Sequence, residues 1–369
     1  MNALPETFSD TTHIETEDLN ATINGSVGKA IHVRNWGQIY PQPLRVWCLV
    51  IALYEEKSLM AIQDTWGRHC DRIFFVVDEK PGQDILRNEA QNTSLHTLLP
   101  IKTTVKSKDL WEKMTKMFVY IEQNHHGEYD YILRADIDTW FSVNNFKSYA
   151  QYFDPNLRWF MGHTELHEPS VAFNAGGNYA MSRGAVEGLV DIFYSDAFRN
   201  GRLTSHNQCV RYRTSWAEDV TFAQCLKTIG IYPVNTMNAQ HQLRWSPFSL
   251  EYTQKLKWGE GERWYFANRF PGKLVKDCCD SNMIALHNII KMSGKWVADK
   301  DGIYSRQAQD GKEDAFHCEI AQRKAMFEKL DEHFQTGEMK RIPVPERPHT
   351  FLFAPTLHLK NRDMMYKLF

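Results

Sequence analysis

An uninterrupted apolar run at residues 46–54 places the strongest constraint on how this chain can fold. The run is nine residues long and does not alternate with polar residues, which is typical of a β-strand buried on both faces. Residues 57–69 then carry apolar side chains at helical spacing, and residues 72–77 form a second β-prone run. Strand, helix and strand in this order form a βαβ unit. This unit predicts an α/β protein with a mostly parallel central sheet flanked by helices.

The remaining pattern predicts one large domain with polar ends. Residues 1–43 are polar and aperiodic and are predicted to form a flexible, stem-like segment. Residues 44–292 hold the periodic elements of a single domain, and residues 293–369 form a C-terminal extension that is partly helical. The other predicted elements are helices over 109–125, 141–153, 184–198, 217–229 and 313–335, strands over 129–135, 159–162 and 283–290, and a surface loop over 83–107.

The charge balance argues against a general nucleic-acid-binding protein. The 369 residues include 43 Lys and Arg against 45 Asp and Glu, which gives a net charge of −2 with His neutral. Binding to a phosphate backbone needs a strongly basic face, which this balance does not favour. The 11 Trp residues leave two interpretations open, a carbohydrate-facing surface and a Trp-rich core.

Glycosylation sequons indicate a secretory compartment. Asn-x-Ser/Thr sequons begin at Asn20, Asn24 and Asn92, and two of them lie in the polar N-terminal segment, where a glycan is sterically tolerated. Seven cysteines are compatible with a cytosolic protein, but together with the sequons they favour disulfides in a lumen. No apolar run reaches the roughly 20 residues of a membrane-spanning helix. A lumenal protein would therefore either lack its anchor in this sequence or enter the lumen unconventionally.

Asp136 and Asp138 are the strongest candidates for chemistry. They follow the predicted strand 129–135 and face the same side of an extended chain. Two carboxylates at the carboxyl end of a buried strand lie where open α/β sheets bind ligands, and they suit Mg²⁺ or Mn²⁺ bridging to phosphate oxygens. The alternative is a pair of loop-capping aspartates. That interpretation suits the second Asp-x-Asp copy at 299–301, which follows no predicted strand.

Basic side chains are the candidates for holding a nucleotide. Neither a P-loop nor a Gly-x-Gly-x-x-Gly motif follows the first predicted strand. A nucleotide would then be held through the metal and by basic side chains, with Lys113, Lys116 and Arg134 as candidates. Taken individually, each of these is more often a surface charge.

The sequence alone does not identify the general base or a third metal ligand. Glu218 and Asp219 open the predicted helix 217–229, where they are either favourable to the helix dipole or a general base. His287 lies in the predicted strand 283–290 and is either a core histidine or a metal ligand. The two histidines of the segment 163–167 have helical ligand spacing, but Pro169 favours a loop over a zinc site there.

Six segments, in order over residues 45–292, carry a family resemblance. The segments are Trp66–Cys70, Leu110–Phe118, Tyr131–Thr139, Ala175–Ser182, Glu218–Cys225 and Asp277–His287. Together they resemble the core 1 β1,3-galactosyltransferase family and, more distantly, the wider β1,3-glycosyltransferase and fringe group. The paired Cys278 and Cys279 before a strand that ends in His are the most specific of these features.

The resemblance implies a GT-A type glycosyltransferase fold, UDP-galactose as donor and Mn²⁺ (or Mg²⁺) as cofactor. By position, Asp138 and His287 would be metal ligands, and Asp136 would lie nearer the ribose or act through a water. Asp219 would be the general base, with Glu218 beside it.

Binding residues are implied in the same way. Lys113 would help to hold the nucleotide, and Trp264 and Tyr265 fall where the family carries acceptor-side aromatic residues. Gly176 and Gly177 would let donor or acceptor approach the backbone closely.

The resemblance also suggests a disulfide pattern. It pairs Cys48 with Cys70 and Cys209 with Cys225. Cys278 and Cys279 are expected to pair with separate partners, because sequence neighbours seldom bond to each other. With seven cysteines, one is either free or bridges two chains of a homodimer.

The activity implied by the resemblance is transfer of galactose, with inversion, from UDP-galactose to the 3-hydroxyl of O-linked GalNAc on a glycoprotein in the Golgi lumen. One alternative is a related β1,3-glycosyltransferase with another UDP-sugar or acceptor. A second is a non-catalytic, chaperone-like relative, although that relative lacks the aspartate motif. The chain departs from the family at Ile137, where a third Asp is common, and at Asn178, which replaces a small residue. The family's type II membrane anchor is not visible in it.

Overall fold

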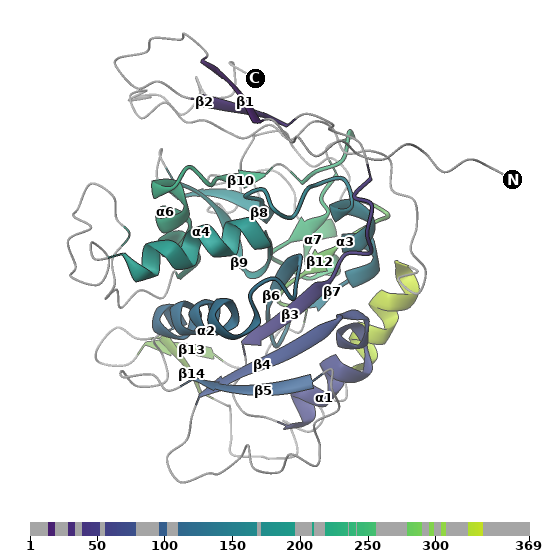
Figure 1. Ribbon diagram of the computed structural model, residues 1–369. Helices are drawn as coiled ribbons and strands as arrows, with labels where there is room; N and C mark the ends of the chain where they lie inside the picture. Colours follow the sequence, from purple (N-terminus) through teal and green to yellow (C-terminus); the bar gives the residue numbers. More distant parts are fainter. Residues whose placement is uncertain are drawn as a thin grey trace, which may run out of the picture.

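A computed structural model of the chain provides the fold (Figure 1). It describes residues 14–18, 29–33, 39–51, 56–78, 96–101, 110–167, 171–195, 209, 218–234, 236–240, 242–255, 279–289, 295–298, 304–307 and 324–334.

A seven-stranded sheet forms the centre of the molecule, in the order β10-β8-β9-β6-β3-β4-β5. Its strands are β3 (Val46–Ile51), β4 (Arg72–Asp78), β5 (His96–Ile101), β6 (Tyr131–Asp136), β8 (Phe160–His167), β9 (Val171–Ser182) and β10 (Pro233–Val234). Only β9 runs antiparallel to its neighbours, β6 and β8, and the other strand pairs are parallel. The prediction of a mostly parallel sheet is confirmed.

Helices cover both faces of this sheet (Figure 1). They are α1 (Glu56–Asp64), the 3-10 helix η1 (Trp66–His69), α2 (Leu110–His125), α3 (Val143–Ala150), α4 (Arg183–Tyr194), α6 (Glu218–Thr228) and α7 (Leu250–Lys255). One apolar cluster packs α2, α4 and α6 on one face of the sheet. The other packs α1, α3 and the helical segment 324–333 on the opposite face. The predicted C-terminal helix is thus confirmed over its described part.

Strand β3 shows why the chain folds around this sheet. All six of its residues are buried. Successive side chains of a strand point to opposite faces. Cys48 and Val50 accordingly belong to one apolar cluster, and Trp47 and Leu49 belong to the other. A strand whose side chains pack into a core on each face has no position for a polar residue. The run at 46–54 accordingly shows no alternation with polar residues.

Short elements complete the described structure. They are the strand pairs β1 (Ile14–Asp18) with β2 (Lys29–Val33) and β13 (Lys295–Ala298) with β14 (Tyr304–Gln307), and a small sheet of β11 (Trp245–Ser246), β12 (Ala285–Leu286) and β7 (Trp140–Phe141). The small sheet brings the chain around His287 against the segment that follows β6.

Three predicted elements need correction. The expected loop over 83–107 contains β5, an edge strand of the main sheet. An edge strand tolerates Pro100, which lacks an N–H, and this proline obscured the strand pattern. The expected strand 283–290 is only the two-residue β12, in the small sheet. The segment 163–167, expected as a loop, lies on β8.

Disulfides agree with the pairing that the resemblance suggested. Cys48 bonds to Cys70 and ties β3 to the end of η1, and Cys209 bonds to Cys225 of α6. Cys279 is also disulfide-bonded, to a partner outside the described residues. Cys278 and the sequons at Asn20, Asn24 and Asn92 lie outside them as well. Within the described part of the chain, no helix is both long and apolar enough to span a membrane.

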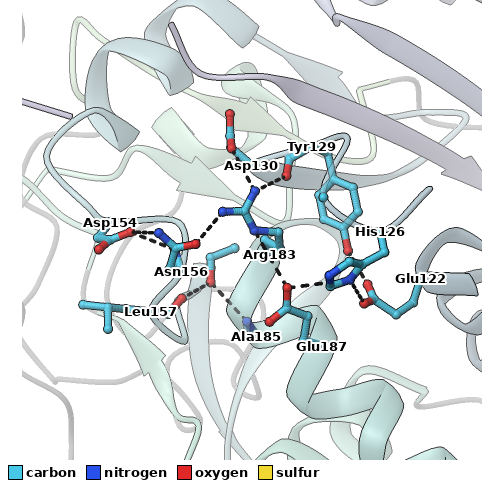
Figure 2. Close-up of polar contacts among 12 residues, drawn as sticks. Glu122, His126, Tyr129, Asp130, Asp154, Asn156, Leu157, Arg183, Ala185 and Glu187 are labelled. Carbon is cyan, nitrogen blue, oxygen red and sulfur yellow. Dashed lines mark hydrogen bonds and ion pairs between the residues drawn. The ribbon is translucent and has the colours of Figure 1, made fainter. Parts of the chain in front are cut away.

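Polar contacts fix the start of β6 (Figure 2). Asp130 accepts a hydrogen bond from the backbone N–H of Arg45 at 2.8 Å, next to the start of β3. The guanidinium of Arg183, at the start of α4, lies 3.3 Å from the Asp130 carboxylate and donates to the carbonyl of Tyr129 at 3.2 Å. Arg183 also donates to the side chain of Asn156. Two strands and a helix therefore share one anchor, which fixes the register of β6 and the position of its far end.

Candidate active site

The far end of β6 lies where the sheet changes its direction of growth. Strand β3 lies between β4, which follows it in the chain, and β6, which is formed later on its other side. Such a switch point, outside the carboxyl ends of parallel strands, is where open α/β sheets bind ligands. Asp136 is the last residue of β6 and pairs in register with Ile51, the last residue of β3. The Asp-x-Asp segment thus begins at the switch point.

Asp136 and Asp138 meet His287 there, although His287 is distant from them in the sequence. Each offers one ligand atom, and these atoms all lie within 4.8 Å of one another. The Nε2 atom of His287 lies 3.2 Å from Asp138 Oδ1 and 3.4 Å from Asp136 Oδ2. The structure therefore brings together the three residues expected as metal ligands.

Hydrogen bonds hold the turn that carries Asp138. The hydroxyl of Thr139 donates to the Gly177 carbonyl at 2.7 Å and accepts from the backbone N–H of Asp136 at 3.3 Å. The backbone N–H of Ile289 donates to the Asp138 carbonyl at 3.3 Å. Thr139 was not among the predicted site residues, although a hydroxyl side chain directly after the Asp-x-Asp motif was the available signal.

The imidazole of His287 is oriented by its neighbour in sequence. The backbone N–H of His287 donates to the Ser246 carbonyl at 3.1 Å. The Nδ1 atom of the His287 ring lies 3.3 Å from the side-chain amide nitrogen of Asn288, so Nε2 is the ring nitrogen that faces the carboxylates. Asn288 has a φ of 50° and donates to the Pro247 carbonyl at 3.0 Å. Asn tolerates this left-handed conformation better than most residues, so its place directly after His287 was a signal that sequence reasoning missed.

Charges at this site favour a cation. Burial by itself would lower the pKa of His287, but the carboxylates of Asp138 and Asp136 outweigh it and raise the pKa to about 10. Burial would raise the pKa of Asp136, but Arg134 and His287 outweigh it and lower the pKa to about 2. The side chains of Asp136 and Asp138 therefore face a position that attracts positive charge.

Gly177 makes room for the His287 ring. Its φ is +92°, and a Cβ added there would lie 2.4 to 2.6 Å from three atoms of the imidazole. The expectation was that this glycine admits donor or acceptor. In the structure, the group that approaches it is a side chain of the protein itself.

Gly177→Ala is predicted to weaken Mn²⁺ binding by about 10- to 100-fold, the range typical of changes that misplace a metal ligand. The added methyl would have to displace the imidazole from the carboxylates. Calorimetric titration of the purified protein with Mn²⁺ measures the effect. Gly127→Ala is the matched control, because Gly127 has a φ of +75° with nothing within 4 Å of an added Cβ. Equal Mn²⁺ affinity in both variants would contradict the prediction.

Asp219 lies on the other side of the same peptide segment. The backbone N–H of Gly176 donates to Asp219 Oδ2 at 2.7 Å, and the N–H of Val220 donates to Oδ1 at 2.8 Å. Adjacent Cα atoms are about 3.8 Å apart. The Asp219 carboxylate therefore approaches Gly176, and the His287 imidazole approaches Gly177, which is the next residue of β9. Asp219 as a residue is partly exposed, whereas Glu218 beside it is buried.

Glu218 and Arg134 are buried behind these groups. Nη2 of Arg134 lies 2.9 Å from Glu218 Oε1 and 3.0 Å from Asp136 Oδ1, and its side chain is 0% exposed. Burial raises the pKa of both Glu218 and Asp219, opposed at Glu218 by Arg134 and at Asp219 by the two backbone N–H donors. The pKa is raised in both acids, and Asp219 is the one that is partly exposed, which suits a general base better than the buried Glu218.

The remaining predicted residues lie on α2 or outside the described residues. Lys113 is buried on α2, and Lys116 on the same helix pairs with Glu112 at 2.7 Å. Trp264 and Tyr265 lie outside the described residues.

A second group with metal-ligating side chains, Glu122, His126 and Glu187, lies on α2 and α4 near the start of β6 (Figure 2). His126, whose side chain is 64% exposed, is hydrogen-bonded to Glu122. Glu122 also accepts from the hydroxyl of Tyr129 at 3.0 Å, and Glu187 lies 3.8 Å from Arg183. Only His126 of the three is exposed, and it is paired with both glutamates.

The donor set at the end of β6 fits a divalent cation better. Two carboxylates and one imidazole converge there from separate segments, and Gly177 leaves the space that the imidazole needs. Carboxylate oxygens suit Mg²⁺ and Mn²⁺, and the imidazole favours Mn²⁺ of the two. Asp136, Asp138 and His287 are therefore the residues that would hold such an ion.

Comparison with known proteins agrees with the family resemblance. The chain is similar to glycoprotein-N-acetylgalactosamine 3-beta-galactosyltransferase 1 of Xenopus laevis, with 20% identity over 298 residues. The aligned part covers 78% of this chain and 70% of that protein. No protein-family model matches the chain. The α/β fold with its mostly parallel sheet is compatible with a glycosyltransferase, and the similarity extends over most of the chain.

Proposed function

We propose that this protein is a metal-dependent, inverting glycosyltransferase of the GT-A type. In this proposal it transfers galactose from UDP-galactose to the 3-hydroxyl of O-linked GalNAc on glycoproteins. Similarity to the Xenopus enzyme supports the transferase role, and the printed activity of that enzyme motivates the choice of donor and acceptor.

The observation that carries the proposal is that a candidate metal site and a candidate general base both lie next to the same pair of glycines. The Asp136, Asp138 and His287 cluster and the Asp219 carboxylate lie on either side of Gly176 and Gly177. A sugar transferase that uses a nucleotide donor needs both groups close together. One holds the diphosphate through a cation, and the other deprotonates the acceptor hydroxyl.

The residues of the chain have distinct roles in this mechanism. Asp136, Asp138 and His287 would hold the cation, which when bound neutralises charge developing on the leaving diphosphate. The carboxylate of Asp219 accepts the proton of the acceptor 3-hydroxyl as that oxygen attacks the anomeric carbon of the donor sugar. Attack from the face opposite the leaving group inverts the configuration. The N–H groups of Gly176 and Val220 keep the Asp219 carboxylate in place.

The compartment follows from the same proposal. The disulfides Cys48–Cys70 and Cys209–Cys225 fit the oxidising lumen of the secretory pathway, where the Golgi is the proposed location. GalNAc-bearing glycoproteins would be the macromolecular partners, and a homodimer bridged by the odd cysteine is a proposed assembly.

A donor screen tests the proposal. UDP release is measured for each UDP-sugar with a GalNAc-bearing peptide as acceptor, with Mn²⁺ and after chelation. We expect release that requires both Mn²⁺ and the peptide and that is fastest with UDP-galactose. A faster rate with another UDP-sugar or a different acceptor would identify a related β1,3-glycosyltransferase. No release with any donor, from protein that binds Mn²⁺, would favour a non-catalytic, chaperone-like protein.

A further inference from the structure

Arg134 is a buried charge that the proposed mechanism does not yet use. It lies on β6 two residues before Asp136, so both side chains face the same side of the sheet. Its guanidinium is covered completely, and it cannot reach a nucleotide in solvent without a rearrangement of the core. It was expected as a nucleotide contact, but its burial favours a different role.

One nitrogen of Arg134 connects the two halves of the candidate site. Nη2 lies 3.0 Å from Asp136 Oδ1, and the other oxygen of Asp136 faces His287. The same Nη2 donates to Glu218 Oε1 at 2.9 Å. Glu218 is the first residue of α6 and directly precedes Asp219. The metal-side carboxylate and the helix that carries the proposed base are thus held by a single side chain.

Stability alone does not explain a guanidinium at this position. Removing a charge from water costs several kcal/mol, and a buried ion pair is often no more stabilising than apolar residues of the same volume. Its Nε and Nη1 atoms also have no hydrogen-bond partner among the described residues. Its side chain is fixed in direction, with Cζ 5.7 Å from the ring centre of Tyr179, its cross-strand partner on β9. An arrangement that is costly but fixed is expected where geometry matters more than stability.

We propose that Arg134 is a positioning residue that sets the Asp136 carboxylate and the start of α6 relative to each other. Through Asp136 it orients the metal site, and through Glu218 it orients the neighbouring Asp219. Glu218 is then the anchor of α6 rather than a second base. This inference rests on the proposed function for its catalytic consequence, but its effect on metal binding is measurable without any sugar nucleotide.

The first test is Arg134→Lys, which keeps the charge and removes the planar fork. We expect Mn²⁺ affinity, titrated with the metal alone, to fall by about 10- to 100-fold, the usual cost of losing a partner that orients a metal ligand. Turnover should fall at saturating Mn²⁺, while the KM for the donor stays near the wild-type value. A lower donor affinity with unchanged Mn²⁺ affinity would overturn the proposal in favour of direct nucleotide contact.

Arg244→Lys is the matched control for burial. Arg244 is also an arginine paired with one carboxylate, with its Nε 2.8 Å from Asp280 Oδ2 and both side chains 5% exposed. It also lies over a tyrosine, with Cζ 5.1 Å from the ring centre of Tyr149. We expect this variant to lose thermal stability while its Mn²⁺ affinity remains that of the wild type. Equal losses of Mn²⁺ affinity in both variants would reduce Arg134 to a structural residue.

A double variant keeps the test decisive if Arg134→Lys does not fold. Arg134→Met with Glu218→Gln removes the buried arginine together with a charge that it neutralises. If Arg134 acts by positioning Asp136 and α6, the folded double variant should bind Mn²⁺ more weakly than the wild type. Wild-type Mn²⁺ affinity in it would overturn the proposal, because arginine would then only balance charge. Wild-type protein that binds Mn²⁺ but transfers no sugar refutes the proposed function and leaves these variants to decide the inference. Wild-type protein that binds no Mn²⁺ overturns both.

Discussion

Asp219→Asn is expected to lower the turnover number by about 10²- to 10⁴-fold, the usual contribution of a general base. The amide cannot accept the proton of the acceptor hydroxyl. The donor should still bind, because Asp219 is not among the residues that would hold the cation. Initial rates of UDP release give the turnover number, and calorimetry with UDP and Mn²⁺ gives donor-site binding. A near wild-type turnover number in this variant would show that another group is the base.

The pH profile gives a second measurement on the same residue. Burial raises the pKa of Asp219 above its ordinary value. A base acts only when ionised, so the turnover number should fall as the pH drops through this raised pKa and should level off above it. Asp219→Asn should remove this acid limb from whatever activity remains. An identical acid limb in the variant would assign it to a different group.

Glu218→Gln is the comparison that separates the two neighbouring acids. Glu218 is buried against Arg134, whereas Asp219 is partly exposed and bonded to Gly176. If Glu218 only anchors α6, its variant retains the acid limb of Asp219 and loses less turnover than Asp219→Asn. A larger loss in Glu218→Gln would reverse the assignment of base and anchor.

The strands that pack on both faces were predictable, and the edge and the small sheet were not. Strand β3 is apolar throughout because it feeds two cores, and that pattern is visible in the sequence. Strand β5 begins with two polar residues, His96 and Thr97, and contains Pro100, features that an edge position permits and that resemble a loop. Strand β12 has only two residues, which pair with the two-residue strands β7 and β11. A pairing between such distant segments leaves no local pattern to detect.

The candidate site was predictable in its residues but not in its supports. The placement of Asp136 and Asp138 at a strand end follows from hydrophobic patterning. The sequence left His287 open as a core histidine or a metal ligand, and only the family resemblance favoured the metal ligand. No pattern in the sequence shows that Gly177 accommodates the His287 ring, because the two are far apart in the chain. The role of Arg134 was obscured for a related reason. A charged residue in a strand is usually exposed, and only the position of α6 shows that this one is covered.

Asp138→Asn is expected to weaken Mn²⁺ binding by about 100-fold or more, because losing a ligand costs at least as much as losing its support. Asp138 is nearly buried and lies 3.2 Å from His287 Nε2, so the amide replaces a charge at the centre of the candidate site. UDP binding that depends on Mn²⁺ should be lost together with the metal. Titration with Mn²⁺ alone, followed by UDP, measures the two effects in order.

The second Asp-x-Asp copy supplies the control for Asp138. Asp301 occupies the same position in its motif as Asp138 does in the first. The prediction that no strand precedes 299–301 was wrong, because β13 ends at Ala298, but β13 belongs to a separate two-stranded antiparallel sheet and not to the central sheet. Asp301→Asn should therefore bind Mn²⁺ and UDP as the wild type does, which would show that the context of the motif carries the function. Equal losses in the two variants would mean that acidic residues attract Mn²⁺ non-specifically. An unchanged Mn²⁺ titration in Asp138→Asn would exclude it as a ligand, and the proposed route of diphosphate binding would fail with it.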